Sequence, residues 1–83
     1  MTTLELGVGD LKPRAVEFTA RELVVTLMDG RKIVTPLEWY PLLLKASVAE
    51  RERYELMATG ILWPDVDEDL SIAGMLKGQR AGK

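Results

Sequence analysis

The pattern of apolar and polar residues predicts a β-hairpin near the middle of the chain. Residues 23–28 read LVVTLM, rich in apolar and β-branched side chains, and Asp29-Gly30 follows directly. Asp-Gly is a strong signal for a two-residue type I′ turn, because that turn needs positive φ at both central residues. Residues 31–35 then form the return strand, which places Val25 opposite Val34.

This register assigns the hairpin side chains to two faces, because alternate residues of a strand point to opposite sides. One face carries Leu23, Val25, Leu27 and Val34, with Lys32 at its tip. The other carries Val24, Thr26, Met28, Ile33 and Thr35. The second face is more apolar than a solvated face requires, so we expect the N-terminal segment or another subunit to cover it.

A further strand precedes the hairpin. Residues 15–19 place Val16 and Phe18 toward the core and Glu17 toward solvent. With a turn at residues 20–22, the three strands form an antiparallel meander. Residues 1–12 are predicted to be a lead-in to this meander. Together with the helices expected after it, the meander predicts an α+β fold, with the helices packed on one face of the sheet.

Two short helical segments are predicted next. Thr35 and Glu38 have the spacing of a capping box, in which each side chain bonds the other residue's backbone N–H. We therefore expect a turn over residues 36–40. Pro41 then restarts a short helix, because the residue before a proline is steered away from helical φ and ψ.

The C-terminal half is predicted to hold two helices and an extended segment. Ser47 and Glu50 form a second capping box, which opens a charged helix that Gly60 ends. Residues 61–63 are apolar and stop at a proline, which indicates an edge strand. Ser71 is the expected N-cap of a last helix over residues 72–77.

Composition restricts the classes of function. The chain has 83 residues, 47% hydrophobic and 29% charged, which indicates one globular domain over residues 1–83. It has no Cys and no His, which removes thiolate sites and the commonest general base. The net charge is −2, and no signal peptide or membrane span is visible. We expect a cytoplasmic protein with no enzymatic activity, cofactor, membrane contact or direct nucleic-acid contact.

An acidic run, Asp65, Asp67, Glu68 and Asp69, provides the candidate chemistry. Spaced carboxylates suit a hard cation such as Ca²⁺ or Mg²⁺, although the EF-hand pattern is absent. The favoured interpretation is that Asp69 and Ser71 cap the last helix while the other acids are solvated or paired. These four residues are the weak metal candidates.

The candidate interaction residues come from the second sheet face and from aromatics beside prolines. Trp39, Tyr40 and Trp63 suit either a ligand-stacking surface or a small core, and the core is favoured. A protein partner or self-association would use the following residues: Val24, Met28, Ile33, Trp39 and Tyr40.

The segments DGR, PLEWYP and AERERYEL, followed by WPDVDEDLS and GMLKG, together resemble the bacterial DUF2442 family of proteins of unknown function. The resemblance covers about residues 13–78 and implies a β-meander with helices and no established catalytic residues. Family members occur alone, joined to a helix-turn-helix domain, or encoded beside a second small protein. That last arrangement has prompted a toxin–antitoxin suggestion. Leu42 and Leu62 depart from the family, whose members often have Arg and His there.

Three hypotheses follow for the function. The first is a non-enzymatic protein-interaction or regulatory module, an antitoxin-like partner of another small bacterial protein. The second is a divalent-cation-binding or minor enzymatic domain that uses the acidic loop 65–69. The third is an acidic inhibitor that occupies a nucleic-acid-binding protein, whose affinity would be sensitive to salt.

Overall fold

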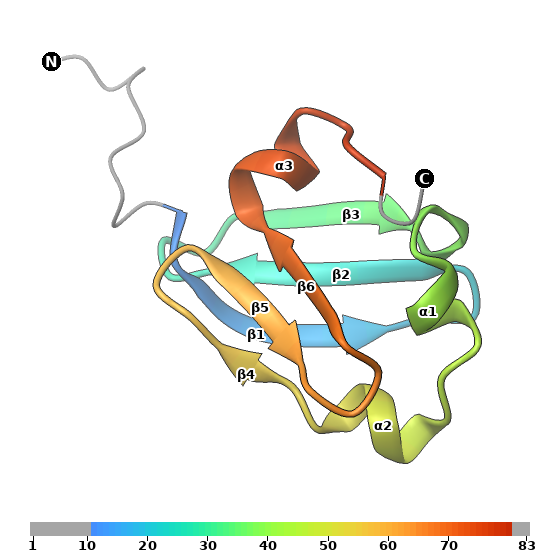
Figure 1. The fold of residues 1–83 in the computed structure, drawn as a ribbon. Helices are drawn as coiled ribbons and strands as arrows, with labels where there is room; N and C mark the ends of the chain where they lie inside the picture. The colour runs from blue at the N-terminus through green and yellow to red at the C-terminus, as the bar shows by residue number, and fades with distance from the viewer. Residues whose placement is uncertain (1–10, 81–83) are drawn as a thin grey trace, which may run out of the picture.

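The computed structural model describes residues 11–80, which form an α+β fold with two three-stranded antiparallel sheets (Figure 1). The first sheet has the strand order β1 (Pro13–Phe18), β2 (Glu22–Leu27) and β3 (Lys32–Pro36). The predicted meander is therefore confirmed. The predicted lead-in over residues 1–12 lies almost entirely outside the described residues.

The hairpin loop between β2 and β3 has three residues, 28–30, enclosed by the hydrogen-bonded Leu27 and Arg31, and the predicted two-residue type I′ turn is wrong. The Leu27 amide donates to the carbonyl of Arg31 at 2.8 Å, which closes the loop around residues 28–30. Gly30 has a φ of 97°, whereas Asp29 is not among the described residues with positive φ. The Asp29 carboxylate accepts the Arg31 amide at 3.0 Å, which stabilises the longer loop. A type I turn closed by a glycine at positive φ is a common three-residue hairpin loop.

The extra loop residue shifts the register by one. Val25 pairs with Ile33, not with Val34 as predicted, and Leu23 pairs with Thr35. Because the side-chain period of a strand is two residues, this shift moves every β3 side chain to the other face. Ile33 and Thr35 consequently face the core, and Val34 faces outward.

The predicted turn after β3 is confirmed as the 3₁₀ turn η2 (Leu37–Trp39), followed by the helix α1 (Pro41–Leu44). The predicted capping box of Thr35 and Glu38 is wrong. Pro36 is the N-cap of η2 and makes no side-chain cap hydrogen bond. Thr35 cannot act as a cap because it lies within β3, where it is buried against the core.

The capping box of Ser47 and Glu50 is confirmed at the start of α2 (Val48–Glu52). The helix is much shorter than predicted, since it ends at Glu52. The next residues form the strand β4 (Glu55–Leu56), which pairs with β5 (Gly60–Trp63). Gly60 therefore belongs to a strand and does not end a helix. A Cβ atom at Gly60 would lie 2.6 Å from the carbonyl oxygen of Leu70, so the close strand pairing requires glycine.

The second sheet was not predicted as a sheet. Its order is β4, β5 and β6 (Glu68–Ser71), so β5 is the central strand and not an edge. The final helix is confirmed as α3 (Ile72–Leu76), where the Ser71 hydroxyl accepts the Gly74 amide at 2.9 Å. No helix within residues 11–80 is long and apolar enough to cross a bilayer.

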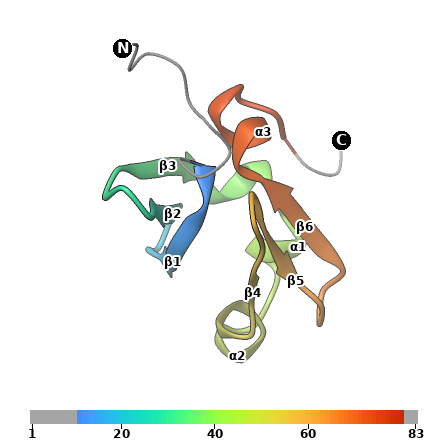
Figure 2. The ribbon, with the colours of Figure 1, turned by 90° about the vertical axis from the view of Figure 1, so that its left-hand side faces the viewer.

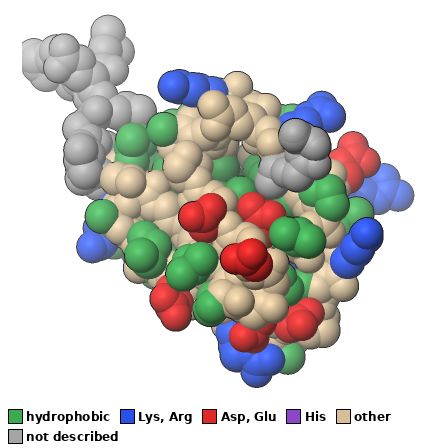
Figure 3. Space-filling model, in the orientation of Figure 1, with side chains coloured by type: hydrophobic (Ala, Val, Ile, Leu, Met, Phe, Trp, Pro, Cys, Tyr) green, Lys and Arg blue, Asp and Glu red, His purple; other side chains and the backbone are tan. Residues whose placement is uncertain are grey.

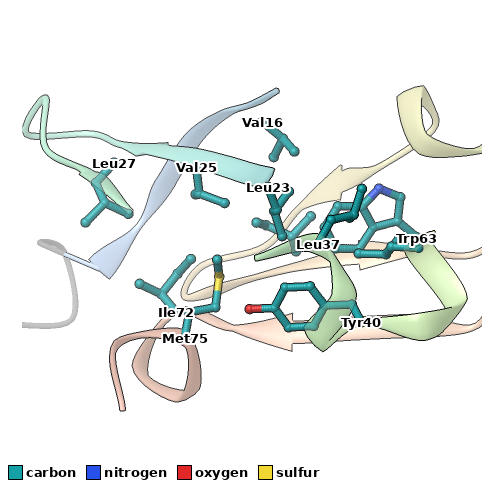
Figure 4. Close-up of a cluster of buried hydrophobic side chains, with 11 residues drawn as sticks. Val16, Leu23, Val25, Leu27, Leu37, Tyr40, Trp63, Ile72 and Met75 are labelled. Carbon is teal, nitrogen blue, oxygen red and sulfur yellow. The ribbon is translucent and has the colours of Figure 1, made fainter. Parts of the chain in front are cut away.

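The core lies between the two sheets, which Figure 2 shows on either side of α1 and α3. Leu23, Val25 and Leu27 come from the first sheet, and Ile61 and Trp63 come from the second. The segments η2, α1 and α3 close the remaining sides with further buried residues. Figure 4 shows most of this cluster, with the Tyr40 hydroxyl pointing toward Met75. The buried hydrophobic cluster within residues 11–80 consists of Val16, Leu23, Val25, Leu27, Leu37, Tyr40, Leu43, Ile61, Trp63, Ile72 and Met75.

Candidate interaction surface

One face of the first sheet points away from the core, and we refer to it as the open face. Cross-strand pairing places Glu17, Val24 and Val34 in one row of this face, and Met28 lies in the loop directly after β2. The exposed fractions of Met28 and Val34 are 53% and 52%, and Val24 is half-buried. Thr26 is a buried member of this face. Strand alternation and pairing give its strand members as Ala15, Glu17, Glu22, Val24, Thr26, Lys32, Val34 and Pro36.

The open face contains two of the five predicted interaction residues. Val24 lies on it, and Met28 directly follows β2 at the position that strand alternation assigns to the same face. Ile33 lies on the opposite face, half-buried against the core, because of the register shift. Val34 takes its place on the open face.

The other two predicted interaction residues, Trp39 and Tyr40, lie at the core. Tyr40 is 0% exposed, so it has no surface to offer a partner. Trp39 is half-buried, and the Arg80 guanidinium lies over its ring at 5.0 Å from the centroid. Trp63 is also 0% exposed, and its indole N–H donates to the Arg51 carbonyl at 3.1 Å. These aromatics therefore pack the interior, which agrees with the favoured interpretation.

A small group of buried polar side chains joins the two sheets. The hydroxyls of Thr35 and Tyr40 lie beside each other, and neither has a well-oriented hydrogen-bond partner among the described residues. Burial raises the pKa of the Tyr40 phenol, and the negative charge of Glu68 raises it further. Both effects favour the neutral phenol.

Glu68 is the buried carboxyl of this group. It pairs with Trp63 across β5 and β6, so it shares the core-facing side of the sheet, and it is only 7% exposed. Burial raises the pKa of the Glu68 carboxyl, and the neighbouring charges of Asp69 and Asp67 add to the shift. Buried carboxyls with a raised pKa occur both in structural ion networks and at functional sites. Burial favours the protonated form of the Glu68 carboxyl.

Residues 65–67 of the predicted acidic loop form a turn between β5 and β6, residues 68–69 begin β6, and the carboxylates do not converge. Asp65 forms an ion pair with Arg53 at 2.6 Å, and Asp67 occupies the turn with a φ of 58°. Glu68 and Asp69 are adjacent residues of β6, so they point to opposite faces. Across residues 11–80, no group of three or more metal-ligating side chains is arranged to hold an ion. Asp69 does not cap α3, because Ser71 is the N-cap.

Arg51 has a structural role that the sequence analysis missed. Its Nε donates to the Leu43 carbonyl at 3.0 Å and its Nη2 donates to the Leu44 carbonyl at 3.0 Å. Its guanidinium also lies over the Phe18 ring at 5.1 Å from the centroid. The charged sequence around it indicated a solvated helix face, and no local pattern distinguishes Arg51 from Arg53.

Comparison with known structures identifies one similar fold. The solution NMR structure of an uncharacterized protein, CV0863 from Chromobacterium violaceum, matches with a TM-score of 0.73 and 20% sequence identity. The match covers 86% of this chain and 69% of that chain. At this identity the likeness shows a shared fold. None of the curated proteins compared matches this chain.

A comparison of the sequence with family models agrees with the resemblance that the ordered segments indicated. The model of the family described as "Protein of unknown function (DUF2442)" matches residues 13–81. This span covers both sheets, η2, α1, α2 and α3. The chain belongs to the DUF2442 family.

Proposed function

We propose that this chain is a cytoplasmic, non-enzymatic protein-interaction module, an antitoxin-like or regulatory partner of another small bacterial protein. The observation that carries the proposal is the open face. Met28 and Val34 expose about half of their side chains there. Exposed apolar side chains grouped on one surface are typical of binding sites.

The position of the open face supports this role. The core uses the opposite side of the first sheet, so binding at the open face leaves the core packing intact. Its charged members are Glu17 and Lys32 on the two outer strands and Glu22 at the start of β2, whereas Val24 lies within the central strand. An apolar centre with charges toward the rim is the usual composition of a protein interface.

Recovery of a partner from the host with a tagged copy tests the proposal. We expect the unmodified chain to recover a specific protein or a second copy of itself. Met28→Lys and Val34→Lys should each abolish recovery, because each places an ammonium group within the apolar contact. Both side chains are about half exposed, so both variants should fold.

Leu42→Lys is the matched control. Leu42 is 47% exposed on α1, outside the first sheet, and the substitution makes the same chemical change. Recovery should survive this substitution. The proposal is wrong if the unmodified chain recovers no specific protein, or if Leu42→Lys abolishes recovery as fully as Val34→Lys does.

A further inference from the structure

Negative charge is concentrated in the second sheet. Residues 54–76 contain five carboxylates and no Lys or Arg. The whole chain has 13 acidic and 11 basic residues, so the remainder has eight acidic against 11 basic. The small net charge of the chain is therefore the sum of an acidic segment, residues 54–76, and a remainder with a slight excess of basic residues. The five carboxylates are Glu55, Asp65, Asp67, Glu68 and Asp69.

Strand pairing places two of these carboxylates on either side of an apolar residue. Leu62 of β5 pairs with Glu55 of β4 and with Asp69 of β6, so the three side chains form one row on the outer face of the sheet. Figure 3 looks onto this sheet and shows acidic and hydrophobic side chains gathered over it. Lys and Arg side chains lie toward the rim of the same view.

A groove of about 470 Å³ runs from this row toward the end of α3. Met57, Leu62 and Met75 give it apolar walls, and Asp69 lines it near the acidic row. Arg80 lines it as well, although its guanidinium is stacked over Trp39. Met57 is 48% exposed, so apolar surface is available to a ligand beside the carboxylates.

Most of the negative charge of this region is not neutralised within the described part of the chain. Asp65 is paired with Arg53 at 2.6 Å. Between residues 11 and 80, no ion pair involves Glu55 or Asp69. Partners with phosphate groups, such as nucleic acids and anionic membranes, would be repelled by these charges. A cationic partner would be attracted.

We propose that this groove binds a basic, amphipathic segment of a partner protein. Apolar side chains of the segment contact Met57 and Leu62, and its Lys or Arg side chains pair with Glu55 and Asp69. The inference deepens the proposed function, on which it rests, by naming the chemistry of the partner. It uses a surface different from the open face, so the two surfaces are separable by mutation.

A labelled peptide of Leu and Lys, with Leu along one helical face, is a direct probe, and fluorescence anisotropy measures its binding. We expect binding that weakens as salt is added, because exposed charges are screened within about 10 Å at 0.1 M ionic strength. A peptide with Gln in place of Leu keeps the charge and should bind at least about tenfold more weakly, because it loses the apolar contact.

The double variant Glu55→Gln/Asp69→Asn should weaken binding of the Leu–Lys peptide about fivefold, as expected for the loss of two exposed ion pairs. The double variant Glu38→Gln/Glu52→Gln is the matched control. It removes the same charge from exposed positions of η2 and α2 that do not line the groove, and it should change the affinity less than about twofold.

Three results would overturn the inference: no binding of the Leu–Lys peptide at low salt, equal weakening by the two double variants, or equal affinity for the Gln-containing peptide. Failure of the inference differs from failure of the proposed function. If Glu55→Gln/Asp69→Asn still recovers the natural partner and Val34→Lys does not, the interaction role stands and the groove is not its site.

Discussion

At the scale of single residues, Arg51 connects more parts of the fold than its neighbour Arg53, which forms a surface ion pair with Asp65. It bonds two consecutive carbonyls at the end of α1, lies over Phe18 of β1, and offers its own carbonyl to Trp63. A guanidinium makes such paired contacts because its donors are held in a rigid plane, which an ammonium group lacks. Arg51 therefore ties α1 and α2 to both sheets.

Arg51→Lys tests this role through the free energy of unfolding. We expect a loss of about 1–2 kcal/mol, because one of two carbonyl acceptors loses a charged donor. Urea denaturation measures the change. Arg53→Lys is the control, because the Arg53 side chain is 63% exposed and its ion pair is at the surface. If the two variants have the same free energy of unfolding, the contacts of the Arg51 guanidinium do not stabilise the fold.

At the scale of elements, the loop between β2 and β3 decides which residues of β3 reach the core. Gly30 has a φ of 97° and no atom within 4 Å of the position that a Cβ would take. The backbone alone therefore selects glycine there, with no steric conflict from neighbouring side chains.

Gly30→Ala should lower the free energy of unfolding by about 1 kcal/mol, because alanine is strained at positive φ. Thermal or urea unfolding measures the loss. Gly30→Asn should recover part of it, since asparagine tolerates this conformation better than alanine does. If alanine were as stable as glycine, the three-residue loop described above would be wrong.

At the scale of the whole molecule, Glu68 makes the stability of the two-sheet packing depend on pH. Burial raises the pKa of Glu68 in the folded state, so the folded protein holds this proton more tightly than the unfolded chain does. The associated stability is fully present below the ordinary glutamate pKa of about 4.3 and is lost as the pH rises through the raised value.

Glu68→Gln removes this pH dependence, because glutamine is neutral throughout. We expect the variant to be more stable than the unmodified chain at pH 7, with the difference shrinking as the pH falls toward 4. Urea unfolding across that range measures it. Glu38→Gln, which removes an exposed carboxylate, controls for net charge. If the gain in free energy of unfolding of Glu68→Gln is the same at every pH, the gain does not come from removing the ionisation of Glu68.

Local signals along the chain predicted those features that depend on neighbouring residues. The caps of Ser47 and Ser71 bond residues three positions away, and each strand of the meander pairs with the next strand along the chain, at most 14 residues away. The apolar character of Val24 and Met28 was also visible, because it depends only on alternation along β2. The family could be identified from the ordered segments for the same reason: each is contiguous.

The tertiary structure decided what depends on distant contacts or on small energy differences. The choice between a two-residue and a three-residue loop moved Ile33 into the core and Val34 out of it. Pairing with β5 converted the predicted end of the charged helix into β4, because strand hydrogen bonds replaced helical ones. The row of Glu55, Leu62 and Asp69 brings together three strands, so Glu55 comes to share one face with a carboxylate of the acidic run, from which it is separated in sequence.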